Sequence, residues 1–434
     1  MTVAGLDGVV VAETVLSEVD GEAGKLVVRG LPVEALAGQV PFEEVARRLW
    51  EGLAPAPPAT PTTAAAVRAA LGRARLAAFR NVEGLRRSAA GLPPVSALRL
   101  GLASLRPGEA GELEPGAALE DGLGAVAPAA AAATAAAATG DHLLATAAIP
   151  VFAAAFERAR RGLPAVVPDP ALGHAADFLR MLRGEPASDA EAAALDAYLV
   201  TVAEHGMNAS TFTARVVAST RAGVLPAVIA ALCALEGPLH GGAPGPVLEM
   251  LDALRGRPDV AGWIAAELAA GRRLMGFGHR IYRVRDPRAD VLKAQVATLR
   301  AATERGAGAA GGLGGSDVAA GAGRAAGAGR AAGAGDTGGR LALAERVERE
   351  ALAALREFRP GRRLDTNVEF YTAVLLDALR IDRGLFTSVF AAGRVAGWTA
   401  HVFEQERANR LIRPQSAYVG PRPAPQPARI VPSA

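Results

Sequence analysis

The stretch EHGMNASTFTARVVAST at residues 204–220 decides the fold class of this chain. Its pattern predicts a helix that is lined with small residues, namely Ala209, Ser210, Ala214, Ala218 and Ser219. Small side chains let neighbouring helices approach closely and pack densely. His205 opens the segment, and a single histidine at a helix start is more often a capping or packing residue than a ligand contact. The stretch therefore predicts tightly packed helices.

The composition extends this prediction to the whole chain. Half of the 434 residues are hydrophobic, enough for a large core, and many of them are alanines, which favour helix. Aromatic residues make up only 4%, and long runs of Val, Ile and Thr are scarce, which argues against an all-β protein. We expect an all-α, mainly helical protein of more than one domain with one small β-hairpin.

The hairpin is predicted at about residues 9–29. The β-rich runs VVVAET and KLVVR are separated by VDGEAG, where Asp20-Gly21 and Gly24 supply turn geometry. The next segment, PFEEVARRLWEG, predicts a helix with one apolar stripe made of Phe42, Val45, Ala46 and Leu49.

Further helices are expected between residues 64 and 234, where Ala- and Leu-rich stretches alternate with Gly/Pro breaks. The proline-rich segment 53–63 precedes them, and the breaks lie at 92–94, 106–108 and 166–173. The alanine run 126–140 predicts a tightly packed helix that is too short and too weakly apolar to cross a bilayer. Two later helices are marked by Val347, Ala351, Leu355 and Phe358, and by Tyr371, Val374, Leu375, Ala378 and Leu379.

Residues 306–339 are low in complexity, with the repeat GAGRAAGAGRAAGAG. Such glycine-rich sequence buries too little surface to offset its ordering entropy, so a flexible loop is predicted. The proline-rich tail, about 421–434, is predicted to be disordered. Composition alone would divide the chain into two domains at the loop.

Charge and cysteine content narrow the possible partners. A net charge of +3 does not indicate nucleic acid binding. Arginines gather at 280–288 and 394–413, which suits an anionic ligand, although a solvated basic face is the alternative. The single Cys233, in the apolar run VLPAVIAALCAL, is expected to be buried and excludes an intrachain disulfide. No secretory signal is visible at the N-terminus, so a cytoplasmic protein without membrane contacts is expected.

His240 lies in the bend GPLHGG, between a helix that Gly237-Pro238 ends and another that begins within APGPVLEMLDAL. The positive end of a helix disfavours an imidazolium, and a neutral imidazole can donate a hydrogen bond to a developing enolate oxygen. The alternative is a histidine that serves turn geometry, and the bend alone does not decide between the two.

His279 lies in GFGHRIYRVRDPRA after two glycines, which let the backbone approach a ligand closely. The arginines at 280, 283, 285 and 288 follow, and a guanidinium can bind a carboxylate through two parallel hydrogen bonds. The Asp286-Pro287 turn is expected to aim Arg288 toward His279. An ordinary surface helix start is the alternative, but it leaves the paired glycines unexplained.

Glu369 lies in DTNVEFYTAVLL, at the entry to an apolar helix. It could be a simple N-terminal helix carboxylate. Beside Phe370 and Tyr371, however, partial desolvation should raise its pKa toward the range of a base. Two histidines and one carboxylate are the minimum set that removes a proton from carbon while carbonyl oxygens are protonated. The three residues together predict carbon–carbon bond formation through an enol.

These segments together resemble the citrate synthase family. The stretch 204–220, then GPLHGGAPGPVLEML, LMGFGHRIYRVRDPRA, and NVEFYTAVLLDALRI through GRVAGWTAHVFEQ, follow in the family's order with plausible spacing. The resemblance covers most of residues 5–420, fails in 306–339 and is thin over 60–180. It implies a helical homodimer with a large domain, 1–241 and 381–434, and a small domain, 242–380. The low-complexity loop then lies inside the small domain, so the chain is not divided there.

The resemblance also implies catalytic roles for three residues. His240 would hydrogen-bond the thioester carbonyl oxygen of acetyl-CoA, Glu369 would remove a proton from its methyl group, and His279 would protonate the oxaloacetate carbonyl. Most family members carry Asp at the base position, whereas Glu369 matches one bacterial branch that reads NVEF. Because Glu is one methylene longer, its backbone must lie slightly further from the substrate.

The implied substrate contacts come from several arginines and one histidine. His205, Arg288 and Arg394 would hold oxaloacetate carboxylates, Arg413 would reach across from the partner subunit, and Arg283 would contact a CoA phosphate.

The implied enzyme is a cytoplasmic acyltransferase of the tricarboxylic acid cycle that needs no metal and no cofactor beyond its substrates. A 2-methylcitrate synthase that uses propionyl-CoA is the close alternative, because pocket size around one methyl group sets the choice. An alternative of another class is a non-catalytic dimeric scaffold or regulator that binds CoA or carboxylates. The intact His240, His279, Glu369 and Arg288 argue against it.

Overall fold

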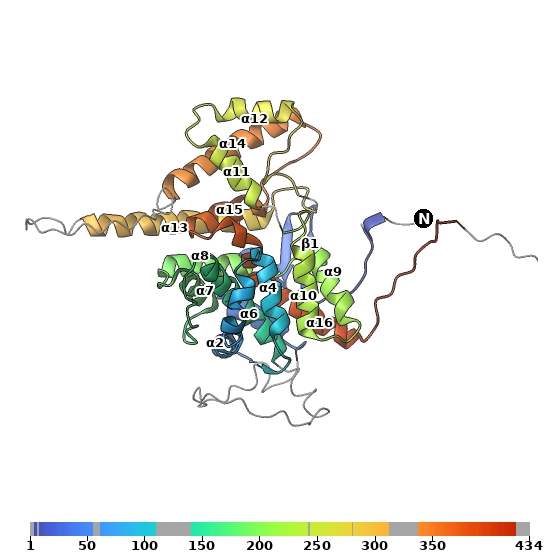
Figure 1. The fold of residues 1–434 in the computed structure, drawn as a ribbon. Coiled ribbons are helices and arrows are strands. Elements are labelled where there is room, and N and C mark those ends of the chain that lie inside the picture. Colours follow the sequence, from blue (N-terminus) through green and yellow to red (C-terminus); the bar gives the residue numbers. More distant parts are fainter. Residues whose placement is uncertain are drawn as a thin grey trace, which may run out of the picture.

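The computed structural model describes residues 4–6, 8–54, 61–109, 140–241, 244–279, 281–311 and 337–421. These residues form a mainly helical molecule with one small sheet, which confirms the predicted fold class (Figure 1). The predicted alanine-rich helix, apart from its last residue, and nearly all of the predicted tail lie outside the described ranges.

Most helices form the lower group in Figure 1. Its centre is made by α6 and α16, since α6 is buried from Asp141 to Arg158 and α16 carries many fully buried side chains. The helices of this group are α1 (Phe42–Trp50), α2 (Ala64–Phe79), α3 (Val82–Ala89), α4 (Pro94–Ser104), α6 (Asp141–Arg160), α7 (His174–Arg183), α8 (Asp189–Val202), α9 (Ala209–Ala218), α10 (Val224–Leu235) and α16 (Phe386–Ala408).

A second group of helices lies above it in Figure 1, made of α11 (Pro244–Leu254), α12 (Val260–Ala269), α14 (Thr337–Phe358) and α15 (Val368–Ala378). The long helix α13 (Pro287–Gly311) runs between the groups, where it contacts α15 on one side and α8 on the other. Short 3-10 turns lie at Ala4–Leu6, Val33–Ala35 and Arg383–Leu385.

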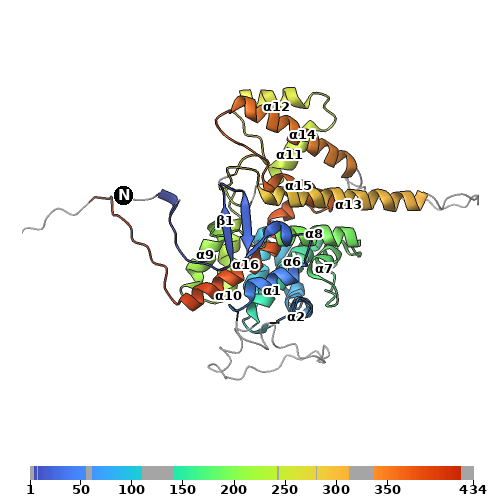
Figure 2. The ribbon, with the colours of Figure 1, turned by 180° about the vertical axis from the view of Figure 1, so that it is seen from behind.

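The sheet stands where the two groups meet (Figures 1 and 2). Its strands β1 (Ser17–Asp20), β2 (Lys25–Val28) and β3 (Leu31–Pro32) are antiparallel, with Ser17 paired to Val28. A hairpin in the predicted region is therefore confirmed, but the prediction that its first strand begins near Val9 was wrong. The four-residue turn pairs Asp20 with Lys25, and β2 ends at Val28, so residues before Ser17 have no β2 partner.

The predicted stripe of the first helix is confirmed, because all four of its apolar residues are buried in α1. The breaks at 92–94, 106–108 and 166–173 also separate or end helices as predicted. The loop predicted at 306–339 was too long at both ends, since α13 continues to Gly311 and α14 begins at Thr337. Once a helix is nucleated, each added residue gains a backbone hydrogen bond, so the alanines beside the glycines extend it.

The prediction for Cys233 was wrong, because its side chain is exposed. Helix α10 is apolar on nearly every side, and it turns Val224, Val228 and Leu232 inward. The sequence therefore did not reveal which face would meet solvent. Across the described parts of the chain, no helix is both long enough and apolar enough to cross a membrane.

Candidate active site

His205 lies in the loop between α8 and α9. The side chain of Asn208 caps α9 by accepting a hydrogen bond from the amide of Thr211, and Gly206 takes a positive φ of 62°. His205 is buried, and its Nε2 lies 3.1 Å from the hydroxyl of Tyr282. Burial lowers the pKa of His205 well below its ordinary value, and the charges of Arg288 and Arg394 add to this. His205 is therefore a neutral group at the edge of a cationic cluster.

His279 is brought to the start of α15 by two glycines with positive φ, 86° at Gly276 and 78° at Gly278. A Cβ at Gly276 would lie 2.8 Å from that of Phe370, so only glycine fits there. The side-chain amide of Asn367 donates to the Gly278 carbonyl at 2.8 Å. The paired glycines thus let the backbone approach another part of this chain, whereas the sequence had suggested a ligand.

The hydrogen bonds of His279 define where its proton lies. Its Nδ1 accepts from the amides of Ile281 and Tyr282, at 3.0 and 3.1 Å, so the ring proton must be on Nε2. Burial lowers the pKa of His279 to about 4, with a further decrease from Arg288, and the ring is neutral near pH 7. Arg288 places a guanidinium nitrogen 3.3 Å from Nε2, which confirms the predicted turn. Because both groups are donors, they converge on a position that suits a substrate oxygen.

Asp286 holds Arg288 in this orientation. Its carboxylate accepts from the Arg288 backbone amide at 3.1 Å and from the guanidinium at 3.0 and 2.8 Å. The same carboxylate accepts from the amide of Val368, at the first turn of α15. Asp286 therefore fixes both the arginine and the helix that carries Glu369, a role that the sequence analysis missed when it assigned Asp286 only to a turn.

Glu369 is the second residue of α15, after the N-cap Asn367. Burial raises its pKa to about 7, Asp286 raises it further, and Arg288 and Arg394 oppose the shift. The residue keeps partial contact with solvent. The predicted shift by desolvation is confirmed in direction, so this carboxyl can both accept and release a proton near neutral pH.

Arg394, buried on α16, links the parts of the cluster. Its Nε donates to the Val202 carbonyl at 2.5 Å, and its guanidinium lies 4.9 Å from the centre of the Phe390 ring. Burial lowers its pKa to about 10, although Glu204 counteracts this. The charge of Arg394 also lowers the pKa of both His240 and Glu369, which indicates that these groups share one electrostatic environment.

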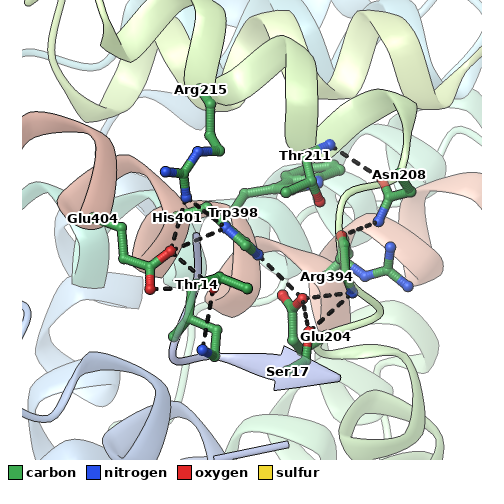
Figure 3. Close-up of polar contacts among 12 residues, drawn as sticks. Thr14, Ser17, Glu204, Asn208, Thr211, Arg215, Arg394, Trp398, His401 and Glu404 are labelled. Atoms are coloured by element: carbon green, nitrogen blue, oxygen red, sulfur yellow. Dashed lines mark hydrogen bonds and ion pairs between the residues drawn. The ribbon is translucent and has the colours of Figure 1, made fainter. Parts of the chain in front are cut away.

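His240 follows α10, and its Nε2 lies 2.8 Å from the hydroxyl of Ser210. Burial lowers the pKa of His240 to about 4, followed by the effect of Arg394. The predicted neutral imidazole is confirmed, but its main cause is burial. Ser210 also accepts from the indole of Trp398 at 3.1 Å and donates to Asn208 Oδ1 at 2.7 Å (Figure 3 shows Trp398 and Asn208).

Two predicted site residues lie apart from this cluster. Arg413 is exposed in the extended segment after α16, and Arg283 is exposed beside Glu22, with 3.8 Å between Nε and Oε1. Arg280 lies outside the described residues. Within this single chain the structure therefore brings together His205, His240, His279, Arg288, Glu369 and Arg394, but neither Arg283 nor Arg413.

Sequence reasoning missed four residues that support the cluster, namely Ser210, Tyr282, Asp286 and Trp398. The sequence pattern indicates only a small packing residue at Ser210, and nothing local marks its contact with His240. Asp286 had a usable signal, because an acidic residue two positions before an arginine can bind its guanidinium.

Within the described ranges, no three His, Cys, Asp or Glu side chains gather in a way that could hold a metal ion.

A model of the family described as "Citrate synthase, C-terminal domain" matches residues 5–415. The chain belongs to the citrate synthase family. It is 45% identical to "Putative citrate synthase 2" of Mycobacterium tuberculosis H37Rv over 57% of this chain and 56% of that protein, so this match spans about half of the relative. Over nearly its whole length this chain is similar to "Citrate synthase" of Haloferax volcanii, with 34% identity over 96% of this chain and 95% of that protein. It is also similar to "2-methylcitrate synthase" of M. tuberculosis H37Rv, with 33% identity over 96% of this chain and 90% of that protein.

Solved structures of citrate synthases share the fold. The enzyme from Pyrobaculum aerophilum is 29% identical, with a TM-score of 0.73 over 98% of this chain and 94% of that one. The enzyme from Thermotoga maritima is 27% identical, with a TM-score of 0.71 over 98% of both chains.

Proposed function

We propose that this protein condenses acetyl-CoA with oxaloacetate to give citrate and CoA, through an enol or enolate and hydrolysis of citryl-CoA. One observation carries the proposal: the neutral Nε2–H donor of His279 lies beside Arg288, in the same charged cluster as Glu369 with its raised pKa. Together they provide a proton donor, an anion-binding cation and a base for carbon chemistry.

Glu369 acts as the base that takes a proton from the methyl group of the thioester. That C–H group is a much weaker acid than any carboxylic acid, so the developing enolate oxygen needs a prepositioned donor, worth about 3–4 kcal/mol. His240 is this donor. The Ser210 hydroxyl donates its one proton to Asn208 Oδ1 in the structure, so the role requires this hydroxyl to turn and donate to His240 Nε2 when the thioester binds. The ring proton then lies on Nδ1, where it can reach the thioester oxygen.

His279 donates its Nε2 proton to the oxaloacetate carbonyl oxygen as the new carbon–carbon bond forms. Arg288, Arg394 and His205 hold the oxaloacetate carboxylates. The buried guanidinium of Arg288, fixed by Asp286, and that of Arg394, balanced by Glu204, support these roles because buried cations bind carboxylates strongly.

The functional unit is a cytoplasmic homodimer that serves the tricarboxylic acid cycle and needs no further cofactor. Residues 1–241 and 381–434 form its large domain, and residues 242–380 form its small domain. Arg413 completes the oxaloacetate site of the partner subunit, and Arg283 binds a CoA phosphate. The exposure of both arginines supports roles outside the single-chain cluster.

The test is release of CoA thiol from acetyl-CoA by the purified protein, with and without oxaloacetate, and identification of citrate as product. Thiol release that depends on oxaloacetate is expected. Absence of release from the purified dimer would reject the enzyme and favour the non-catalytic scaffold.

A second candidate is 2-methylcitrate synthase, which uses propionyl-CoA. It is favoured by the nearly equal identities to the 2-methylcitrate synthase and the citrate synthase relatives, 33% and 34%, each over 96% of this chain. A methylene group changes binding by only about 1–3 kcal/mol, so kcat/KM must be compared for both thioesters. A clear preference for propionyl-CoA would replace the first proposal.

A further inference from the structure

Strand β1 presents one face to the two loops that carry His205 and His279. Side chains alternate along a strand, so Ser17 and Val19 share a face and Gly21 continues its line. Ser17 Oγ donates to Glu204 at 2.8 Å. Val19 packs on Gly206, where a Cβ would lie 3.2 Å from Val19 Cγ2. This face of β1 therefore contacts the residues on both sides of His205, Glu204 and Gly206.

The base of the hairpin joins a buried polar network around Glu204, the residue before His205 (Figure 3 shows Glu204 and Ser17). Glu204, which is fully buried, accepts from the Gly206 amide at 2.7 Å and from His401 Nε2 at 3.1 Å, in addition to Ser17. Burial raises the pKa of Glu204, but His401 holds that pKa below its ordinary value. The Glu204 carboxylate is therefore ionised, and the proton of its hydrogen bond with His401 lies on Nε2 of the histidine. The residues on both sides of His205, Glu204 and Gly206, are therefore held in place by hydrogen bonds.

The N-terminal segment attaches to the same network at a second carboxylate. Glu404 accepts from the hydroxyl of Thr14 at 2.9 Å and from the amide of Val15 at 2.9 Å. Arg215 donates to the same carboxylate at 2.8 Å and lies 3.1 Å from His401 Nδ1. Thr14 and Val15 are thus held on α16 by Glu404, one turn after His401, which holds Glu204 beside His205.

The tip of the hairpin packs on the segment between His279 and Arg288. The Gly21 carbonyl accepts from the amide of Arg283 at 2.8 Å. A Cβ at Gly21 would clash with the carbonyl oxygen of Ile281, and one at Gly24 would lie 2.6 Å from Val284 Cγ2. The loop can occupy this position only because both hairpin residues lack a side chain.

We propose that the β1–β2 hairpin, residues 17–28, is a positioning element that fixes the loop with His279 and the start of α13 with Arg288 relative to His205, and so sets the affinity for oxaloacetate. The rings of His205 and His279 lie 5.9 Å apart, and the hairpin contacts the chain next to each of them. That the ligand is oxaloacetate rests on the proposed function, whereas the contact between the hairpin and residues 281–284 does not.

The first test replaces Gly21 by Ala. Its φ is not positive, so Ala keeps the turn but pushes residues 281–285 away. Gly91→Ala is the control, because that glycine also lacks a positive φ and has open space around it. We expect Gly21→Ala to weaken oxaloacetate binding on the order of tenfold by calorimetry, since small displacements are costly in such sites. It should also speed hydrogen exchange in residues 281–290 of the ligand-free protein.

The second test loosens the base of the hairpin. Ser17→Ala and His401→Ala should each raise the KM for oxaloacetate more than they lower kcat. His401→Gln, whose amide can replace the Nε2 donor, should restore part of the affinity. If the hairpin had only a structural role, these substitutions would lower stability without raising KM more than they lower kcat, and His401→Gln would not restore affinity.

The outcomes separate the hairpin proposal from the proposed function. If Gly21→Ala leaves either the exchange of 281–290 or oxaloacetate affinity as in wild type, the hairpin proposal is overturned. If wild type binds oxaloacetate but releases no thiol, the condensation is rejected, and the two Gly21→Ala measurements still decide on the hairpin. If wild type binds no oxaloacetate, the proposed ligand and the proposed control of its affinity both fail.

Discussion

At the scale of single residues, the raised pKa of Glu369 predicts how activity depends on pH. A base must be ionised to accept a proton, and this carboxyl ionises at about 7. We expect kcat/KM for the thioester to rise about tenfold per pH unit below about 7 and to level off above it. A pH–rate profile measures this, and Glu369→Gln should abolish most turnover at every pH. A profile that stays flat through pH 7 would contradict the assignment.

The same shift predicts that Glu369 reduces stability at high pH. The pKa of Glu369 in the folded protein lies above its ordinary value of 4.5, so its stabilising contribution is complete below about 4.5 and is lost as pH rises through about 7. Glu369→Gln should therefore stabilise the ligand-free protein at pH 8 by about 1–2 kcal/mol, allowing for partial exposure, and much less at pH 5. Unfolding curves at both pH values check this, with the exposed Glu18→Gln as control. An equal effect at both values would show that the ionisation of Glu369 is not responsible.

Ser210 predicts an effect on His240. Its hydroxyl is the hydrogen-bond partner of His240 Nε2, at 2.8 Å, and its removal frees the ring to rotate and to change tautomer. We expect Ser210→Ala to lower kcat about ten- to a hundredfold and to leave oxaloacetate affinity nearly unchanged. Thr213→Ala is the control, because Thr213 lies on the same helix and bonds only to a carbonyl of that helix, Ala209. Steady-state kinetics with both substrates measure the difference, and an unchanged kcat would remove Ser210 from the mechanism.

The sequence predicted those site features that depend on local geometry. Arg288 was predicted to turn toward His279, because the Asp-Pro turn between them is local. The main cause of the low pKa of His240 could not be predicted, since it is burial among residues from distant parts of the chain, such as Phe390, whose ring centre lies 6.3 Å from that of His240. The partnership of Ser210 with His240 was missed for the same reason.

At the scale of elements, helices were easier to predict than the strand and the exposed helix face. The stripe of α1 is local and periodic, and it was found. The start of β1 depends on the register that the turn imposes, so the β-rich run at Val9 misled the prediction. The outer face of α10, where Cys233 is exposed, depends on tertiary neighbours, because the helix is apolar on almost every side.

The contact between Gly276 and α15 predicts a sensitive point in the backbone. Gly276→Ala adds a Cβ that would lie 2.8 Å from Phe370 Cβ, and α15 must shift together with Glu369. Gly271→Ala is the matched control, since it has a similar positive φ, 73° against 86°, but open space around it. The control should cost only the φ strain, about 1 kcal/mol, and Gly276→Ala about 1–3 kcal/mol more with most turnover lost. Denaturant unfolding and thiol release measure both, and equal effects would refute this packing argument.

At the scale of the whole molecule, the described segments before β1 and after α16 leave the helical body on the same side (Figures 1 and 2). Residues 8–14 and 409–421 lack helix and strand, and they expose apolar side chains such as Val10, at 86%, and Val419, at 95%. Burial of these side chains against a second copy would remove apolar surface from water. This arrangement supports the proposed homodimer.

The proposed role of Arg413 can be tested by mixing two inactive variants. In a dimer of one Glu369→Gln subunit and one Arg413→Ala subunit, the site with the intact base receives an intact arginine only if Arg413 acts on the partner subunit. We therefore expect each variant alone to be nearly inactive and the co-expressed, doubly tagged hybrid to recover about half of the wild-type thiol release per dimer. If Arg413 acted within its own chain, every site of the hybrid would lack one group and no activity would return. Co-expression of Glu369→Gln with Arg394→Ala is the control. Arg394 lies in the buried cluster of its own chain, so that hybrid should stay inactive.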